Sequence, residues 1–438
     1  MKNILVLGAG LVSKPLVRYL LDHNFHVKIA SRTVSKAEAL IDGHPNGSTQ
    51  AWLADDTAEL EEMVKGVDLA ISLLPAAHHV TVAELCIKHK KQMVTTSYVS
   101  DAMKALDSKA KDAGVMVLNE IGVDPGIDHM SAMRIIHEVQ GKGGKVISFR
   151  SYCGGLPAPE ANNNPLGYKF SWSPRAVLLA SRNDGRYLQD GKEIYIPGPD
   201  LFSHYWAMNI EGLPEMEAYT NRNSLGYVEL YGLEGIPTMY RGTLRYPTWC
   251  DSMKKWADLG LLNLDERDLS GLTCGDLIRQ LAGGSTGSDL KQDLAKFWNT
   301  DVSDVAISKL EWLGVLSDMP LPFEKGSVLD VLCHVMNEKM PYAPGERDMI
   351  VLHHEFIAEY PSKKEKITST LIDYGIPNGD SSMARTVSLP AAVGARLIMD
   401  GKITATGVHI PVSPDLYNPV LDELARLNIE FKEKIIPY

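Results

Sequence analysis

The chain has 438 residues, more than one ordinary domain holds, so we expect two or three domains. Hydrophobic residues make up 45% and charged residues 23%, the balance of a globular protein with ample apolar material for its cores. The formal net charge of -11 argues against a nucleic-acid partner, because binding to a phosphate backbone needs a basic face. Small anionic substrates stay compatible with this charge, since they need only a few local cations.

Cysteine and hydropathy patterns bear on the location of the protein. The five cysteines show no paired spacing, so the sequence predicts neither a zinc site nor a disulfide framework and favours a reducing compartment. No apolar run is long enough to span a bilayer, and the strand-like opening leaves no room for a signal peptide. We therefore expect a cytoplasmic protein with no membrane partner.

The first 125 residues alternate between strand-like and helix-like stretches. Continuous aliphatic runs are typical of strands buried on both faces, and strict alternation predicts a doubly wound parallel sheet with helices on its faces. The helical patterns cover residues 14–22, 35–41, 57–64, 80–89 and 102–113. The predicted strands are NILVL from Asn3, HVKIA from His26, QAWLA from Gln50, DLAISLL from Asp68, QMVTTS from Gln92 and VMVLN from Val115.

The texture of the chain changes near Phe149. Gly, Pro and Asn become dense, and short pieces such as EIYIPG and GYVELYG read as strands, which predicts a mixed-sheet α/β domain with long loops. Apolar residues at three-to-four spacing in CGDLIRQLAGG, DVAISKLEWLGVLSD and SVLDVLCHVMNEKM predict a small inserted helical domain.

Strand signals return at DMIVLHHEFIAEY and KITSTLIDYG, and a helix follows from SMARTVSLPAA to a stop at Gly401. The small residues of this helix would permit close packing against a sheet, and we expect the final segment to return to the first domain. The expected division is therefore 1–125 plus 390–438 for a dinucleotide-binding domain, 126–255 plus 345–389 for a substrate domain, and 256–344 for the helical insertion.

The stretch VLGAGLVSKPL resembles the G-x-G-x-x-G turn of Rossmann-like dinucleotide-binding domains. Gly8 and Gly10 follow a strand and precede a helix, so they suit a tight turn and a close approach of the backbone to a pyrophosphate. Ser13 replaces the third glycine; it is small enough for helix–strand packing, and its hydroxyl could reach a phosphate. The alternative is a glycine turn without a ligand.

The end of the second strand favours NADP(H) over NAD(H). An NAD site usually places Asp or Glu against the ribose 2′-hydroxyl, whereas this chain has Ser31, Arg32 and Thr33. Arg32 offers a planar donor fork for a 2′-phosphate, although it could instead be a solvated surface residue.

Further strand ends should face the cofactor, because ligands lie outside the carboxyl ends of parallel strands. Asp55 could contact the adenine or cap the following helix, and Ser97 or Ser100 could be a helix N-cap. The predicted cofactor contacts in this part of the chain are Gly8, Gly10, Leu11, Val12, Ser13, Ser31, Arg32, Thr33, Ala54, Asp55, Leu74, Pro75, Thr96 and Ser97.

The segment EIGVDPGIDH follows the sixth strand and places three ionisable residues at the expected cofactor rim. Asp128 and His129 are adjacent, so on a helix they would point in different directions, and no His-rich cluster supports them. We therefore expect no metal. Asp124 could be a site residue or only a turn residue before Pro125.

The segments SYCGGLPAPEANNNPLGYKFSWSP, TTSYVS, EIGVDPGIDH, YTNRNS and RGTLRY together resemble the saccharopine reductase family, the NADP-dependent, glutamate-forming saccharopine dehydrogenases of the aminoadipate lysine pathway. The resemblance runs from the glycine turn through SSMARTVSLPAA. It implies a Rossmann-like domain, a mixed-sheet substrate domain, a helical insertion and a homodimer. It also implies that α-aminoadipate δ-semialdehyde and L-glutamate condense to an imine that NADPH reduces to L-saccharopine.

The resemblance assigns residues on the substrate side. It places Val123 and Asp124 near the nicotinamide, and Trp172, Ser173 and Arg175 in a segment that touches the cofactor. One departure is Asn223, where relatives often have Asp, which affects how Arg222 is held. The implied substrate contacts are Ser97, Tyr98, Asp124, Cys153, Arg222, Thr243, Leu244 and Arg245.

Substrate charge and proton transfer support this interpretation. Saccharopine carries three carboxylates, which arginine binds bidentately, so Arg222 and Arg245 are the main candidates and Lys169 and Arg241 further ones. For the acid–base group we favour Asp124, directly or through a water, with Tyr98, His129 and Cys153 as alternatives. His129 could equally be a structural histidine.

Two other functions remain open at this point. A related imine-reducing dehydrogenase could act on a polyamine precursor such as carboxynorspermidine, although fewer carboxylates would make paired arginines less expected. A non-catalytic NADP-binding sensor would bind the cofactor without turnover.

Overall fold

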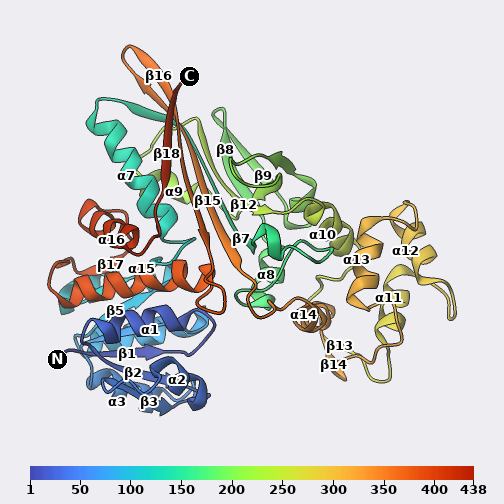
Figure 1. Ribbon diagram of the computed structural model, residues 1–438, viewed down its shortest axis with the longest axis horizontal. Helices are drawn as coiled ribbons and strands as arrows, with labels where there is room; N and C mark the ends of the chain where they lie inside the picture. The colour runs from blue at the N-terminus through green and yellow to red at the C-terminus, as the bar shows by residue number, and fades with distance from the viewer. The chain divides into compact units, whose positions relative to one another are not determined.

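The computed structural model describes all residues from 1 to 438 and divides them into two compact units (Figure 1). The first unit comprises Met1–Val146 and Ala358–Tyr438, and the second comprises Ile147–Ile357. The first unit thus includes residues 126–146 and 358–389, which we had grouped with a substrate domain. The division into three domains stays a prediction.

A seven-stranded sheet forms the centre of the first unit, in the order β17-β6-β5-β4-β1-β2-β3. Every neighbouring pair is parallel. This confirms the doubly wound parallel sheet, and β17, from the final segment of the chain, pairs with β6. The strands are β1 (Asn3–Leu7), β2 (His26–Ser31), β3 (Gly47–Ala51), β4 (Leu69–Ser72), β5 (Gln92–Thr95), β6 (Met116–Leu118) and β17 (Gly407–His409).

Two groups of helices pack against this sheet. A core of buried side chains joins the sheet to α3 (Thr57–Lys65), α4 (His79–Lys88) and α6 (Asp107–Ala113). The other group contains α15 (Ser382–Met399), which packs on β4 and β5 and contacts α1. Further helices of this unit are α1 (Ser13–Asp22), α2 (Val34–Ile41), α7 (Ile127–Gly141) and α16 (Pro414–Arg426). The strands β16 (Lys363–Tyr374) and β18 (Lys432–Pro437) pair antiparallel.

The small residues of α15 allow its close approach to the sheet, as the sequence predicts. Ala391, Ala392, Gly394 and Ala395 are buried, and a Cβ on Gly394 would lie only 2.7 Å from Ile121 Cδ1. A larger residue at Gly394 would therefore require the side chains of Ile121 and Leu118 to shift.

Three predicted elements differ in the structure. β3 begins at Gly47 rather than Gln50, and none of its residues is buried. The helix expected at 102–113 is two helices, α5 (Asp101–Lys104) and α6, because Leu106 N–H donates to the Met103 carbonyl and tightens the turn. GYVELYG is not a strand but contains the helix α9 (Gly226–Leu230), which buries Tyr227 and places Tyr231 one turn later against the core.

The second unit contains a mixed sheet, as the sequence predicts. β12 (Thr238–Arg245) runs parallel to β7 (Lys145–Pro157) and antiparallel to β11 (Met216–Thr220), and β11 pairs antiparallel with β10 (Tyr205–Met208). The unit boundaries fall within β7 and within β15 (Asp348–Tyr360). A hairpin of β8 (Gly185–Gln189) and β9 (Lys192–Ile196) joins the sheet through β8.

The chain between β12 and β15 is mainly helical, as the sequence predicts. None of the helices in the chain combines the length and apolarity that crossing a bilayer requires. The elements of this part are α10 (Trp249–Asp258), α11 (Cys274–Ala282), α12 (Leu290–Trp298), α13 (Val305–Leu313), α14 (Val328–Lys339) and the short strands β13 (Arg267–Asp268) and β14 (Lys325–Gly326), and α8 (Pro174–Ala180) precedes them.

Candidate cofactor and substrate sites

The glycine turn between β1 and α1 has the geometry that a bound pyrophosphate needs. Gly8 has φ +108°, and a Cβ there would lie 3.2 Å from the Leu73 carbonyl oxygen. A Cβ on Gly10 would meet nothing within 4 Å, so the space in front of this residue is open. The first turn of α1 has no side-chain cap and no acidic residue. The dipole of α1 therefore favours an anion, although Ser13 N–H donates to the Gly10 carbonyl and Pro15 has no N–H.

Ser13 supports this turn from within. Its side chain is buried, and its Oγ accepts a hydrogen bond from Gly10 N–H over 3.0 Å and donates to the Gly8 carbonyl over 3.3 Å. The hydroxyl therefore joins the two glycines, and this use differs from the phosphate contact that we considered. The serine replaces the third glycine of the motif and adds a link that glycine lacks.

Arg32 lies just after β2 with an exposed side chain. Its guanidinium makes no hydrogen bond or ion pair within the protein, whereas Thr33 N–H bonds to the Ser31 hydroxyl over 3.3 Å. All of its donors are available for a ligand, as a 2′-phosphate site requires.

The other strand ends resolve two alternatives. Asp56, not Asp55, caps α3 by accepting from Glu59 N–H, so the exposed Asp55 is not the helix cap. Ser100 caps α5 by accepting from Met103 N–H, and Ser97 makes a different contact. Leu11 and Pro75 are exposed and Ala54, Leu74 and Thr96 are partly buried at the carboxyl ends of their strands.

Ser97 bonds to a histidine that the sequence did not single out. His79 Nε2 lies 2.8 Å from Ser97 Oγ, and His79 Nδ1 lies 2.9 Å from Ser72 Oγ. The ring is 4% exposed. Burial, with a smaller contribution from the neighbouring charge of His78, lowers the pKa of His79 to about 4, so the ring is neutral near pH 7. No motif marks His79, because only the sheet brings it to Ser97.

Tyr98 and Asp124 meet at the end of the same sheet. The Tyr98 hydroxyl donates to Asp124 Oδ1 over 2.9 Å, and both side chains are partly exposed. Val123 is buried beside them, and a Cβ on Gly122 would lie 3.2 Å from Thr96 Cβ. The structure thus brings together the residues from TTSYVS and EIGVDPGIDH that we assigned to one site.

Glu120 holds these two segments in place, a role that the sequence did not reveal. It is buried with φ +55°; its Oε1 accepts from Val99 N–H over 2.9 Å and its Oε2 lies 2.8 Å from His129 Nε2. Asp128 Oδ1 accepts from Gly126 N–H over 2.6 Å. His129 is fully buried and bonded to Glu120, which favours the structural alternative over an acid–base role.

In the second unit, Arg245 is the last residue of β12. Its side chain is 7% exposed, and its guanidinium carbon lies 5.0 Å from the Tyr168 ring centre and 5.4 Å from that of Trp249. Nη1 donates to the Leu244 carbonyl over 2.8 Å, whereas the buried Nε has no partner. Such an unsatisfied donor on a buried cation is costly and fits an anionic ligand.

Neighbouring strands bring further predicted residues to Arg245. Thr243 is directly opposite Cys153 of β7, and a Cβ on Gly154 would lie 2.9 Å from Leu244 Cβ. Cys153 and Thr243 are partly buried. The substrate candidates SYCGG and RGTLRY are therefore adjacent strands of one sheet.

The turn that carries Arg222 is tied to the same sheet. Arg222 is exposed with φ +54°, and its carbonyl accepts from Arg186 N–H of β8 over 2.9 Å. On either side, Asn221 N–H donates to the Arg241 carbonyl, and Arg241 N–H donates to Ser224 Oγ over 2.9 Å. Asn223 Oδ1 accepts from Leu225 N–H, so the residue that departs from the family pattern shapes the turn.

Two further cations are already engaged. Arg241 is buried with its guanidinium carbon 4.3 Å from the Tyr227 ring centre. Lys169 is buried and forms an ion pair with Glu346 over 2.5 Å. These contacts make both residues weaker candidates for substrate binding than Arg245.

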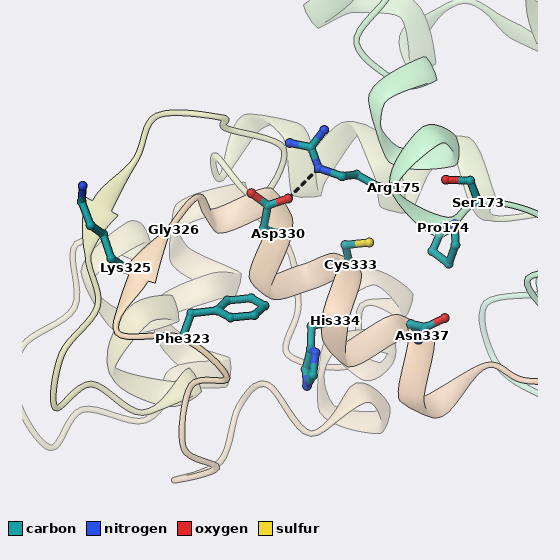
Figure 2. Close-up of a pocket in the computed structure, with 10 residues that line it drawn as sticks. All are labelled: Ser173, Pro174, Arg175, Phe323, Lys325, Gly326, Asp330, Cys333, His334 and Asn337. Carbon is teal, nitrogen blue, oxygen red and sulfur yellow. Dashed lines mark hydrogen bonds and ion pairs between the residues drawn. The ribbon is translucent and has the colours of Figure 1, made fainter. Parts of the chain in front are cut away.

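The Trp172–Arg175 segment borders an open pocket of about 520 Å³ (Figure 2). Arg175 Nε donates to Asp330 Oδ1 of α14 over 2.8 Å, as the dashed line in Figure 2 shows. Ser173 caps α8 through Ala176 N–H, and the Trp172 indole donates to the Tyr168 hydroxyl over 3.3 Å. The hydrogen bond from Trp172 thus connects this segment to Tyr168, whose ring faces Arg245.

No group of three or more His, Cys, Asp and Glu side chains could hold a metal ion, and all five cysteines are free.

Glu217 accepts from the backbone N–H groups of Thr248 and Cys250, and the buried Lys309 of α13 donates to the Thr248 carbonyl over 2.7 Å. This cluster fixes the start of α10, where Trp249 faces Arg245.

Comparison with known proteins identifies the family. Residues 4–118 match the saccharopine dehydrogenase NADP binding domain, and residues 122–429 match the saccharopine dehydrogenase C-terminal domain. The saccharopine dehydrogenase [NADP(+), L-glutamate-forming] of Schizosaccharomyces pombe is 42% identical and that of Pyricularia oryzae 40%; the matches cover 100% and 99% of this chain, and 99% of each relative.

A solved structure agrees over the whole chain. The apo histidine-tagged saccharopine dehydrogenase (L-Glu forming) from Saccharomyces cerevisiae has a TM-score of 0.91 and 38% identity, with 100% of both chains covered. The Rossmann-like sheet of the first unit is therefore the NADP-binding fold of these proteins, and the mixed sheet is their C-terminal fold. The chain belongs to the saccharopine dehydrogenase family.

Proposed function

We propose that this protein is an NADP-dependent, L-glutamate-forming saccharopine dehydrogenase of the aminoadipate lysine pathway. In the biosynthetic direction, the aldehyde of α-aminoadipate δ-semialdehyde and the amine of L-glutamate lose water to form an imine. Hydride addition at the imine carbon and protonation of the nitrogen then give L-saccharopine. One structural observation carries the proposal: Arg245 presents a buried Nε without a protein partner, in a chain that matches the family throughout its length.

The residues at the end of the parallel sheet fit a dinucleotide with a 2′-phosphate. The open space at Gly10 and the uncapped first turn of α1 suit the pyrophosphate, and the unpaired Arg32 suits the 2′-phosphate. When it is bound, NADPH supplies the hydride that reduces the imine.

The residues of the chain then bind carboxylates and move protons. Arg245 and Arg222 bind substrate carboxylates; the aromatic rings around Arg245 lower the local polarity and strengthen the charge-assisted bonds. Asp124, directly or through a water, accepts and returns the protons of imine formation and hydrolysis, and the Tyr98 hydroxyl orients its carboxylate. Ser97, which lies just after β5, also binds the substrate.

The deciding experiment mixes purified protein with L-saccharopine and either NADP or NAD while the absorbance of the reduced nicotinamide is followed. The proposal expects turnover with saccharopine and faster turnover with NADP. Turnover with carboxynorspermidine but not with saccharopine would show that the substrate is a polyamine precursor. Cofactor binding without turnover of either compound would indicate a sensor.

We further propose a homodimer in a reducing compartment such as the cytoplasm. Five free cysteines, three of them buried, are compatible with reducing conditions. Sedimentation of the purified protein tests the dimer, and a mass of one chain across the micromolar range would contradict it. Fractionation of source cells tests the compartment.

A further inference from the structure

His79 is a buried histidine whose ring bridges the ends of two neighbouring strands. Ser72, the last residue of β4, contacts Nδ1 over 2.9 Å, and Ser97, just after β5, contacts Nε2 over 2.8 Å. Thr95 Oγ1 lies at the longer distance of 3.4 Å from Nε2. The imidazole therefore connects a serine inside the protein to a serine at the candidate site.

The surroundings of Ser72 decide which ring nitrogen carries the proton. Ser72 is fully buried, and its hydroxyl contacts only His79. A buried hydroxyl needs an acceptor for its hydrogen, and the only one within reach is an unprotonated Nδ1. A neutral imidazole then carries its proton on Nε2 and donates it to Ser97 Oγ.

This direction has a consequence for Ser97. Its Oγ accepts from the ring, so its own hydrogen points elsewhere, and His79 is the one side-chain partner of this partly exposed hydroxyl. The low pKa of His79, about 4, keeps the ring neutral and the direction constant over the working pH range.

We propose that His79 is a positioning residue, which, with its proton on Nε2, makes the Ser97 hydroxyl a hydrogen-bond donor toward a carboxylate oxygen of the substrate. The inference rests on the proposed function, because it takes Ser97 as a substrate contact. His79 itself acts only through Ser97 and touches no substrate.

A double-mutant cycle tests the proposal in the full-length enzyme. We expect Ser97→Ala and His79→Phe each to raise the KM for saccharopine about 10- to 100-fold, as the loss of one hydrogen bond to a charged group does, with a smaller change in kcat. The double variant should be no worse than Ser97→Ala alone, because His79 acts through that hydroxyl. His79→Gln keeps a donor and should recover most of the loss. The proposal would be overturned if the rises in KM of the two single variants multiplied in the double variant. It would also be overturned if His79→Phe and His79→Gln raised the KM equally.

A direct measurement separates this inference from the activity. In protein labelled with 15N-histidine, the ring signals of His79, assigned by their loss in His79→Gln, should show a neutral ring protonated at Nε2 from pH 6 to 8. A proton on Nδ1 would overturn the inference even in an active enzyme. Absence of turnover with saccharopine in the wild-type protein would instead contradict the proposed function, while the NMR result would still decide the tautomer.

Discussion

The Tyr98 hydroxyl donates a hydrogen bond of 2.9 Å to Asp124 Oδ1, although 26 positions separate the two residues. Glu120 reinforces this contact, because one of its carboxylate oxygens accepts from Val99 N–H and the other contacts His129. The proposed acid–base group is therefore held by a phenol from a neighbouring strand end, and both segments share one buried carboxylate. Substitutions of the site residues test the proposed roles.

Tyr98→Phe should lower kcat/KM for saccharopine about 10- to 100-fold, because one hydrogen bond to a carboxylate is worth roughly 1.5–3 kcal/mol. Tyr195→Phe is the matched control, since Tyr195 makes a 2.9 Å bond to Asp184 at an exposed position in the other unit. The control should keep wild-type kinetics. Equal losses in the two variants would show that the Tyr98 contact has no special role in turnover.

Arg32→Asp should raise the KM for NADP about 10- to 100-fold and change the KM for NAD much less, because the substitution removes a cation and repels the 2′-phosphate. The melting temperature should stay unchanged, since Arg32 has no partner in the protein. Arg182→Asp, at another exposed arginine without a side-chain partner, is the control. Parallel losses with both dinucleotides would exclude contact with the 2′-phosphate.

Gly8→Ala and Gly10→Ala should separate folding from cofactor binding. A Cβ at Gly8 meets the Leu73 carbonyl at φ +108°, so this variant should lose about 1–3 kcal/mol of unfolding free energy. A Cβ at Gly10 enters open space, so this variant should fold normally but bind NADP at least tenfold more weakly. Denaturant unfolding and fluorescence titration measure the two effects. Unchanged affinity in Gly10→Ala would place the pyrophosphate elsewhere.

Arg245→Lys should raise the KM for saccharopine about 10- to 100-fold, because an ammonium lacks the planar fork that holds a carboxylate by two bonds. Arg279→Lys in the helical insertion is the matched control and should leave the kinetics unchanged, because the partly buried Arg279 also has an unpartnered Nε but pairs with Asp276 through Nη1. A normal KM in Arg245→Lys, with the fold intact by circular dichroism, would remove Arg245 from the substrate site.

His79 should also make stability depend on pH. Its pKa is about 4 in the folded protein and near 6.5 in an unfolded chain, so the unfolded chain binds the proton more readily. The free energy of unfolding should therefore fall as pH drops from about 6.5 to 4, by up to about 3 kcal/mol from this residue. His79→Gln should show a correspondingly shallower decline in urea titrations. Identical slopes in the two proteins would mean that the buried ring is not held neutral.

The local chemistry of the first unit could be predicted from the sequence. Gly8, Gly10 and the aliphatic strands indicate a parallel sheet with a phosphate-binding turn, because turn conformation and two-sided burial depend on short stretches of chain. Errors occurred where packing outweighs local preference. The polar β3 lies at the sheet edge, the 102–113 helix is interrupted at Ala105–Leu106, and GYVELYG forms the helix α9 because Tyr227 and Tyr231 pack on the core.

The sequence by itself thus determined the fold class, the dinucleotide turn and the preference for a 2′-phosphate, together with the family resemblance that the comparisons confirm. Only the tertiary structure decided the contact between His79 and Ser97, the burial of His129 against Glu120 and the unsatisfied Nε of Arg245. The physical reason is that a buried polar group takes its partner from whichever strand lies beside it. That neighbour is set by the order of strands in the sheet and not by distance along the chain.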